Sequence, residues 1–149
     1  MYAPLAGSVI PLAEVPDPAF GLLGAGVAVE PAGQGEVTAR APISGTLLTL
    51  RSHAFAILDD QGRAVLVHLG IDTAGLRDGG FTRLRAKGDR IRVGEPVTRW
   101  NLTALAGRSP LCPVIALEAP EVTRTAAGTV QVGDRLFVWN NSPSKEDHG

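Results

Sequence analysis

Two of the three histidines in this 149-residue chain bracket one candidate β-hairpin. His53 precedes the apolar run 54–58, His68 ends the apolar run 64–68, and the turn-forming segment 59–63 joins the two runs. Imidazole has an ordinary pKa of about 6.5, so it offers an unprotonated nitrogen at cellular pH. Two imidazoles held together could act as a nucleophile and a hydrogen-bond donor, or as metal ligands.

The position of the turn decides whether the two histidines meet. A turn centred between Asp60 and Gln61 predicts that they face each other directly across the ladder. Directly opposed Cβ atoms lie roughly 4.5–5.5 Å apart, close enough for two rings to share a small ligand. The same register places Phe55 and Leu66 on the histidine face. A shift of one residue would put the histidines on opposite faces, so this pairing is a geometric hypothesis.

The residue pattern leaves three interpretations open. In nucleophilic phosphoryl transfer, a neutral histidine attacks phosphorus while its neighbour donates a hydrogen bond to a phosphoryl oxygen. The carbonyl of Gly70 would then fix the tautomer of His68, and Asp72 lies just beyond it. A second interpretation is a zinc site formed by His53, His68 and Asp72 with an open fourth position. The third is a pair of core histidines with satisfied hydrogen bonds.

Composition excludes several other classes of protein. The 14 basic and 15 acidic residues leave a net charge of -1, which argues against a dedicated nucleic-acid binder. The single cysteine, Cys112, excludes an internal disulfide and a CxxC motif, and we expect it to be a small buried apolar residue. The longest apolar run, 21–29, is too short to insert into a membrane, and the start lacks the basic residues of a signal peptide. We therefore expect a cytosolic protein.

Glycine and proline are distributed between short apolar segments, which predicts an all-β fold. Two different motifs each occur twice, which indicates paired β-units that close on each other in an antiparallel sandwich or barrel. The copies are 3–12 with 41–50, and 93–100 with 132–139. We expect further strands at 26–30, 37–39, 54–58, 64–68 and 113–117, and at most short helical turns at 73–76 and 102–106, capped by Asp72 and Asn101. Residues 1–140 are expected to form one domain, followed by a polar tail at 141–149.

The segment Val65-Leu66-Val67-His68-Leu69-Gly70-Ile71-Asp72-Thr73, together with Ser52-His53-Ala54, closely resembles the glucose family of enzyme IIA proteins. These proteins belong to the bacterial phosphoenolpyruvate-dependent sugar phosphotransferase system. The resemblance covers about residues 3–139, with further matching segments at 3–7, 15–20, 24–28, 79–81, 88–91 and 109–114. It implies a β-sandwich or barrel with a duplicated motif, and a free-standing, monomeric, cytoplasmic phosphotransferase component that supports sugar uptake.

The resemblance also implies roles for individual residues. His68 matches the histidine that accepts a phosphoryl group from the phosphocarrier protein HPr and passes it to a cysteine on the IIB domain of a sugar permease. His53 matches the second histidine, which hydrogen-bonds the phosphoryl group and is needed for onward transfer. The flanking residues that match the family are the acidic Asp17 and Asp72, the apolar Phe20 and Leu66, and Ala74 on the same rim. No cofactor is implied, although the two histidines could share a zinc ion with a regulatory partner.

One position departs from the family pattern. Arg51 stands where the family commonly has a threonine that hydrogen-bonds the first histidine and the phosphate. Either Ser52 supplies the hydroxyl, or Arg51 contacts phosphate as a bidentate donor, or no substitute exists. Of these we expect Ser52.

Other patterns have structural or alternative readings. The basic residues concentrated in 77–99 could mark an anionic partner or a membrane surface, but the alternation in 83–85 and 90–92 favours a solvated strand face. Trp100 and Trp139 are expected in the core. A zinc peptidase would normally need a further histidine, and the chain has none outside the tail. A biotinyl or lipoyl carrier would need a modifiable lysine in a hairpin tip, which is missing because Lys87 and Lys145 are the only lysines. A non-catalytic regulatory binding protein is the remaining alternative.

Overall fold

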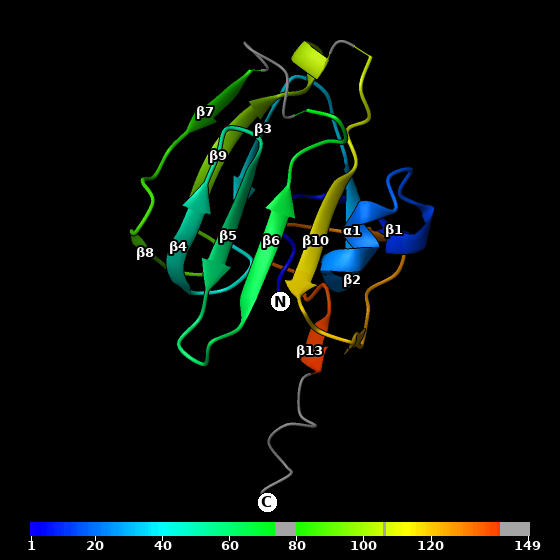
Figure 1. Cartoon of the computed structure of the whole chain (residues 1–149). Coiled ribbons are helices and arrows are strands. Elements are labelled where there is room, and N and C mark those ends of the chain that lie inside the picture. The colour runs from blue at the N-terminus through cyan, green and yellow to red at the C-terminus, as the bar shows by residue number, and fades with distance from the viewer. Residues whose placement is uncertain (74–79, 106, 141–149) are drawn as a thin grey trace, which may run out of the picture.

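The computed structural model describes residues 1–73, 80–105 and 107–140, and its strand pairs are antiparallel. The largest sheet has eight strands, in the spatial order β12 (Thr129–Val130), β1 (Gly7–Pro11), β2 (Gly24–Pro31), β10 (Cys112–Leu117), β6 (Ala64–His68), β5 (Ala54–Leu58), β4 (Gly45–Leu50) and β8 (Arg90–Ile91). A three-stranded sheet contains β3 (Glu36–Arg40), β9 (Pro96–Asn101) and β7 (Phe81–Arg83), and a two-stranded sheet pairs β11 (Glu121–Thr123) with β13 (Val138–Asn140). The predicted all-β architecture is confirmed (Figure 1).

Helical structure is limited to three short elements among the described residues. The predicted turn after Asn101 is the 3-10 helix η2 (Leu102–Leu105), and the Asn101 Oδ1 atom accepts a hydrogen bond from the Thr103 backbone N–H at 3.0 Å. The elements η1 (Leu12–Glu14) and α1 (Ala19–Leu23) were not predicted, because the prolines around them resemble loop punctuation. The predictions for 74–76, Ala74, Ala106 and the tail at 141–149 lie outside the described residues.

The two duplicated motifs make equivalent contacts, which confirms that the fold is built from paired units. The Ala3 N–H donates to the Asp134 carbonyl at 2.8 Å, and the Ala41 N–H donates to the Glu95 carbonyl at 2.9 Å. Gly133 and Gly94, both at positive φ, return hydrogen bonds to Ala3 and Ala41 respectively. Each copy of the first motif therefore closes on one copy of the second.

The hairpin register differs by one residue from the prediction. His68 pairs with Ala54, not with His53, and Leu66 pairs with Ala56. The connection has three residues between Asp59 and Arg63, with Gly62 at φ +83°, a loop length that shifts the pairing. The Asp59 carboxylate stabilises this loop by accepting hydrogen bonds from the Gln61 and Arg63 backbone N–H groups, both at 2.9 Å.

The two faces of the large sheet pack against different clusters. Alternate residues on one face, such as Val67 and Val114, join the main core, which also contains Phe55, Trp100 and Trp139. The opposite face carries a smaller cluster of Val15, Phe20, Ala28, Ile71 and Ile115. Leu66 packs against this cluster. Phe55 therefore lies in the core, away from the face of Leu66, and its predicted place beside the histidines is wrong. The register shift is the reason.

Several smaller predictions can be compared directly with the structure. Cys112 is fully buried, and burial raises the pKa of its thiol to about 12, so it behaves as an apolar residue. Ile91 is buried between the exposed Arg90 and Arg92, as expected for a strand with one solvated face. Within the described residues, no helix has both the length and the apolar character needed to span a bilayer.

Candidate functional site

His68 is the last residue of β6 and shares its face with Leu66, the face on which α1 packs. Its Nδ1 atom lies 2.7 Å from the carbonyl oxygen of Gly70. A carbonyl oxygen can only accept a hydrogen bond, so Nδ1 carries the proton and Nε2 keeps its lone pair. The nitrogen available to an incoming electrophile is Nε2.

Gly70 holds this carbonyl in place because of its backbone conformation. Its φ is +85°, a region that side chains other than glycine rarely adopt. A Cβ atom there would lie 2.5 Å from the Thr73 Cγ2 atom and 3.4 Å from the Trp100 ring. The Thr73 hydroxyl in turn donates to the Leu69 carbonyl at 2.7 Å and closes the turn after β6.

His53 reaches His68 from the bend before β5, although the two residues are not paired in the ladder. The Leu69 backbone N–H donates to the His53 carbonyl at 2.7 Å, which ties this bend to the end of β6. The two imidazole rings meet edge to face, with centroids 4.9 Å apart and an interplanar angle of 73°. The predicted proximity is therefore confirmed, while the predicted direct opposition is wrong.

Phe20 of α1 also contacts the His68 ring. The ring centroids are 4.9 Å apart at 69°, and Phe20 is buried in the smaller apolar cluster. The His68 ring therefore contacts both Phe20 and His53. Helix α1 packs on β2 and β10 and so positions the phenylalanine (Figure 1). This contact could not be derived from strand register, because α1 was not predicted.

Both histidines are held neutral by their surroundings. Burial lowers the pKa of His68, opposed by the hydrogen bond to Gly70 and by the charge of Asp17. Burial also lowers the pKa of His53, and the charges of His68 and Arg51 lower it further. Desolvation disfavours the imidazolium form, so both rings are neutral near pH 7, each with a single N–H. A neutral Nε2 atom on His68 is suited to nucleophilic attack.

Acidic residues lie on the α1 side of the site. Asp17 and Asp72 line the same hollow of about 400 Å³, together with Arg108. The Asp17 carboxylate accepts a hydrogen bond from the Ala19 N–H at 3.0 Å at the start of α1. The Arg108 Nε donates to the Asp72 carbonyl at 2.9 Å, which leaves the Asp72 side chain on the rim. The structure therefore brings both predicted acidic residues together.

Basic residues lie on the His53 side. Arg51 and Ser52 line a groove of about 470 Å³ with His53, and the other lining residues are Thr49, Leu50, Thr73, Arg83 and Lys87. Sequence reasoning did not connect Arg83 and Lys87 with the histidines. The basic residues of this region indicated a solvated strand face or, less favoured, a surface for an anionic partner, and the fold alone brings β7 and its following turn to this groove.

Metal ligands do not gather at the site within the described part of the chain. No three His, Cys, Asp or Glu side chains there lie close enough to hold an ion. The interpretation of His53, His68 and Asp72 as a three-ligand zinc site is not supported by this arrangement. Two imidazoles at one edge would need further ligands from another molecule.

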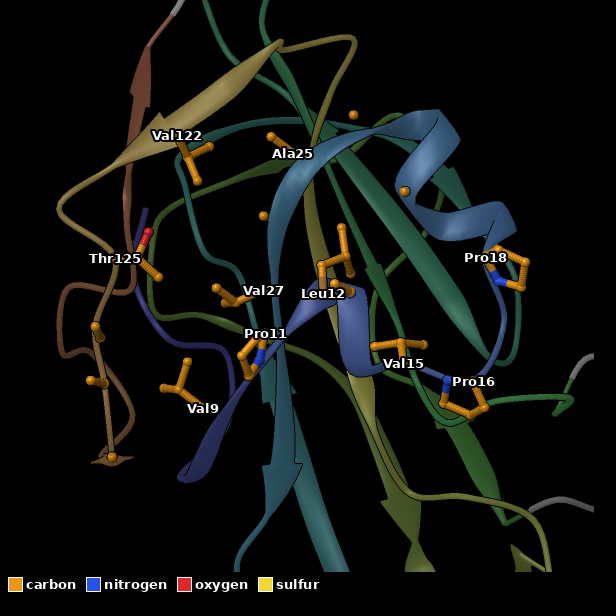
Figure 2. A pocket seen from close by; sticks show the side chains of 17 residues that line it. Val9, Pro11, Leu12, Val15, Pro16, Pro18, Ala25, Val27, Val122 and Thr125 are labelled. Carbon is orange, nitrogen blue, oxygen red and sulfur yellow. The ribbon is translucent and has the colours of Figure 1, made fainter.

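A larger hollow, of about 940 Å³, lies between β1, β2 and the segment 122–128 (Figure 2). Apolar side chains such as Val9, Leu12 and Val27 line it, and no ionisable side chain of the described residues does. It therefore lacks groups that could transfer a proton or a phosphoryl group. The chemistry of the chain is concentrated at the histidine pair.

Comparison with known families agrees with this site. Residues 1–122 match the model of the EIIA 1 component of the phosphoenolpyruvate-dependent sugar phosphotransferase system. The chain belongs to this EIIA family. The matched region contains both histidines, both acidic residues and Phe20.

A solved structure extends the comparison over nearly the whole chain. Glucose permease IIA from Mycoplasma capricolum is 30% identical in sequence and superposes with a TM-score of 0.82. The match covers 91% of this chain and 92% of that one. This EIIA protein therefore has the β-sandwich fold of the glucose type, and it is a phosphotransferase component of a sugar transport system.

Proposed function

We propose that this EIIA protein accepts a phosphoryl group from phosphorylated HPr on the Nε2 atom of His68 and passes it to a cysteine of a IIB domain. The observation that carries the proposal is the 2.7 Å contact between the His68 Nδ1 and the Gly70 carbonyl, which leaves Nε2 as the nucleophile. Membership of the EIIA family supports transfer of the phosphoryl group from HPr to this protein and from it to IIB.

In the first step, the Nε2 lone pair of His68 attacks phosphorus of the HPr phosphohistidine. The donor P–N bond breaks and its electron pair returns to the donor imidazole. The His68 ring then carries a positive charge, which the Nδ1–H hydrogen bond to Gly70 stabilises. The His53 ring, 4.9 Å away, donates an N–H to a phosphoryl oxygen.

In the second step, the thiolate of the IIB cysteine attacks phosphorus and the N–P bond breaks. The electron pair returns to the His68 Nε2, and the neutral ring is regenerated. Arg51 and Ser52 lie on the His53 side, where either could contact the phosphoryl group as a hydrogen-bond donor. The step needs no metal or nucleotide held by this chain.

The partner surface combines an apolar centre with charged flanks. Phe20 and Leu66 lie beside His68, and Leu22 of the same helix is 87% exposed. Asp17 and Asp72 would attract basic groups on HPr and IIB. Both partners dock in turn on this one surface, so each complex must be transient.

The proposal extends to the setting in which the protein works. Residues 1–140 act as one monomeric domain in the cytoplasm, where HPr and the IIB domain are available. A regulatory role is a second candidate, in which a partner binds the same surface and completes a zinc site with His53 and His68. The paired rings at one edge support it.

Intact-mass analysis tests the principal proposal. The protein is mixed with phosphoenolpyruvate, enzyme I and HPr, alongside His68→Ala and His53→Ala variants. We expect one acid-labile, alkali-stable phosphoryl group on the wild type and on His53→Ala, and none on His68→Ala. An unmodified wild type, or a modified His68→Ala variant, would overturn the proposal.

A further inference from the structure

The basic groove beside His53 has the lining of an anion site. We define it by Arg51, Arg83, Lys87, His53, Thr49 and Ser52, which surround a volume of about 470 Å³. Arg51 and Ser52 come from the bend before β5, Arg83 from β7 and Lys87 from the turn after it. Three separate segments of the chain thus contribute polar groups to one hollow.

The basic side chains of this groove differ from the neighbouring arginines, which form ion pairs with carboxylates. Arg85 lies 3.8 Å from Glu95, and Arg90 lies 3.1 Å from Asp60. Among the described residues, no carboxylate lies within ion-pair distance of Arg51, Arg83 or Lys87. Three like charges around one groove repel each other, and a bound anion would relieve that repulsion.

The groups present match the chemistry of phosphate recognition. A guanidinium presents a planar set of donors to phosphate oxygens, an ammonium adds a point charge, and hydroxyls add further donors. The lowered pKa of His53 keeps its ring neutral, so the ring contributes an N–H donor and no charge. The volume falls within the roughly 300–1,000 Å³ of small-molecule sites. That is more room than one phosphate group needs, and leaves space for an attached carbon skeleton.

We propose that this basic groove reversibly binds a small organic phosphate, and that the occupied groove opposes phosphorylation of the protein. A dianion beside His53 would repel the second dianion that arrives on His68, whose ring is 4.9 Å from that of His53. By linkage, phosphorylation of His68 must weaken binding in the groove by the same factor. Binding stands on the groove alone, whereas the opposing effect rests on the proposed function.

Binding is tested on the unphosphorylated full chain by two-dimensional proton–nitrogen NMR. Inorganic phosphate and glucose 6-phosphate are titrated separately against chloride at constant ionic strength. We expect saturable shifts at 49–53, Arg83 and Lys87, with the organic phosphate binding more tightly than the inorganic ion. The double variant Arg83→Gln/Lys87→Gln should weaken binding at least tenfold, while Arg92→Gln, on the exposed neighbouring strand end, should leave it unchanged.

Three results would overturn the inference. Shifts that do not saturate would mean ionic screening only, and equal binding by the double variant would place the anion elsewhere. Shifts caused by an acidic peptide such as polyglutamate, with none caused by either phosphate, would assign the groove to a protein partner. The opposing effect is measured as the rate of phosphoryl acceptance from HPr with and without glucose 6-phosphate, in wild type and double variant.

These measurements separate the two proposals. The double variant retains His68, His53 and Gly70, so it should accept a phosphoryl group at the wild-type rate when no ligand is added. Loss of acceptance in wild type would contradict the proposed function without affecting the binding result. If the wild type accepts a phosphoryl group at the normal rate and glucose 6-phosphate does not slow this acceptance, only the opposing effect is contradicted.

Discussion

The Nδ1 atom of His68 donates a hydrogen bond to the carbonyl oxygen of Gly70, two residues further along the chain, across 2.7 Å. This short contact occupies Nδ1 and leaves the lone pair of Nε2 free. The position of this carbonyl oxygen depends on the backbone of Gly70, which has a φ of +85° and packs closely on the side chain of Thr73. The reactivity of the histidine is therefore linked to a backbone conformation.

Gly70→Ala should reduce both stability and phosphoryl acceptance. A left-handed alanine costs roughly 1–3 kcal/mol, and its Cβ would also lie 2.5 Å from Thr73 Cγ2, so the turn and its carbonyl must move. Urea unfolding and the rate of acceptance from HPr measure the two effects. Gly88→Ala is the control, because Gly88 has φ +93° and nothing within 4 Å. It should lose stability to backbone strain alone and keep its rate; equal rates for both variants would contradict the role of the Gly70 carbonyl.

His53→Ala should separate acceptance from onward transfer. We expect acceptance by His68 to continue, while transfer to the IIB cysteine falls by roughly 10²–10³-fold, the usual loss when one donor to a developing charge is removed. Transfer of a labelled phosphoryl group to IIB measures the second step. His53→Gln keeps an N–H donor and should recover part of the rate. An alanine variant that transfers at the wild-type rate would rule out a donor role for His53.

Acidification should lower both the stability and the reactivity of the protein. Burial lowers the folded-state pKa of His68 and of His53 below the ordinary 6.5, so the unfolded chain binds more protons between the folded and unfolded pKa values. The stabilisation is fully present above about pH 6.5 and decreases as the pH falls through the folded values. Urea unfolding across this window, with His68→Gln/His53→Gln as the control, measures it. NMR titration midpoints at or above 6.5 would contradict the shift.

Phe20→Ala should affect the site and the fold together, unlike a change at its exposed neighbour. Phe20 is buried against His68, and its loss should cost about 3 kcal/mol and allow the pKa of His68 to rise toward its ordinary value as water enters. Leu22→Ala removes a side chain that is 87% exposed and should change stability by less than about 0.5 kcal/mol. Thermal unfolding and histidine titration measure the first variant, and binding of HPr measures the second. If the Leu22→Ala variant binds HPr as tightly as the wild type does, α1 is not part of the docking surface.

Much of the fold followed from local sequence patterns. The runs 54–58 and 64–68 are β5 and β6 with the predicted ends, and strands β2, β3 and β10 extend the predicted segments by one or more residues. Alternation of apolar residues and the position of turn-forming residues are properties of short segments, so they can be derived without the tertiary structure. Helix α1 was missed because Pro16 and Pro18 mark a loop by the same local rules.

By itself, the sequence determined the chemistry of the site: two histidines around one hairpin, a glycine two residues after the second, and a duplicated β motif. Only the tertiary structure decided how these groups meet. The three-residue loop moved His53 out of register with His68, and the bend before β5 brought their rings back to 4.9 Å. Burial in the folded protein then lowered the pKa of His68, and β7 brought Arg83 to the groove of Arg51. Register, burial and charge proximity depend on segments far apart in the chain, so no local pattern contains them.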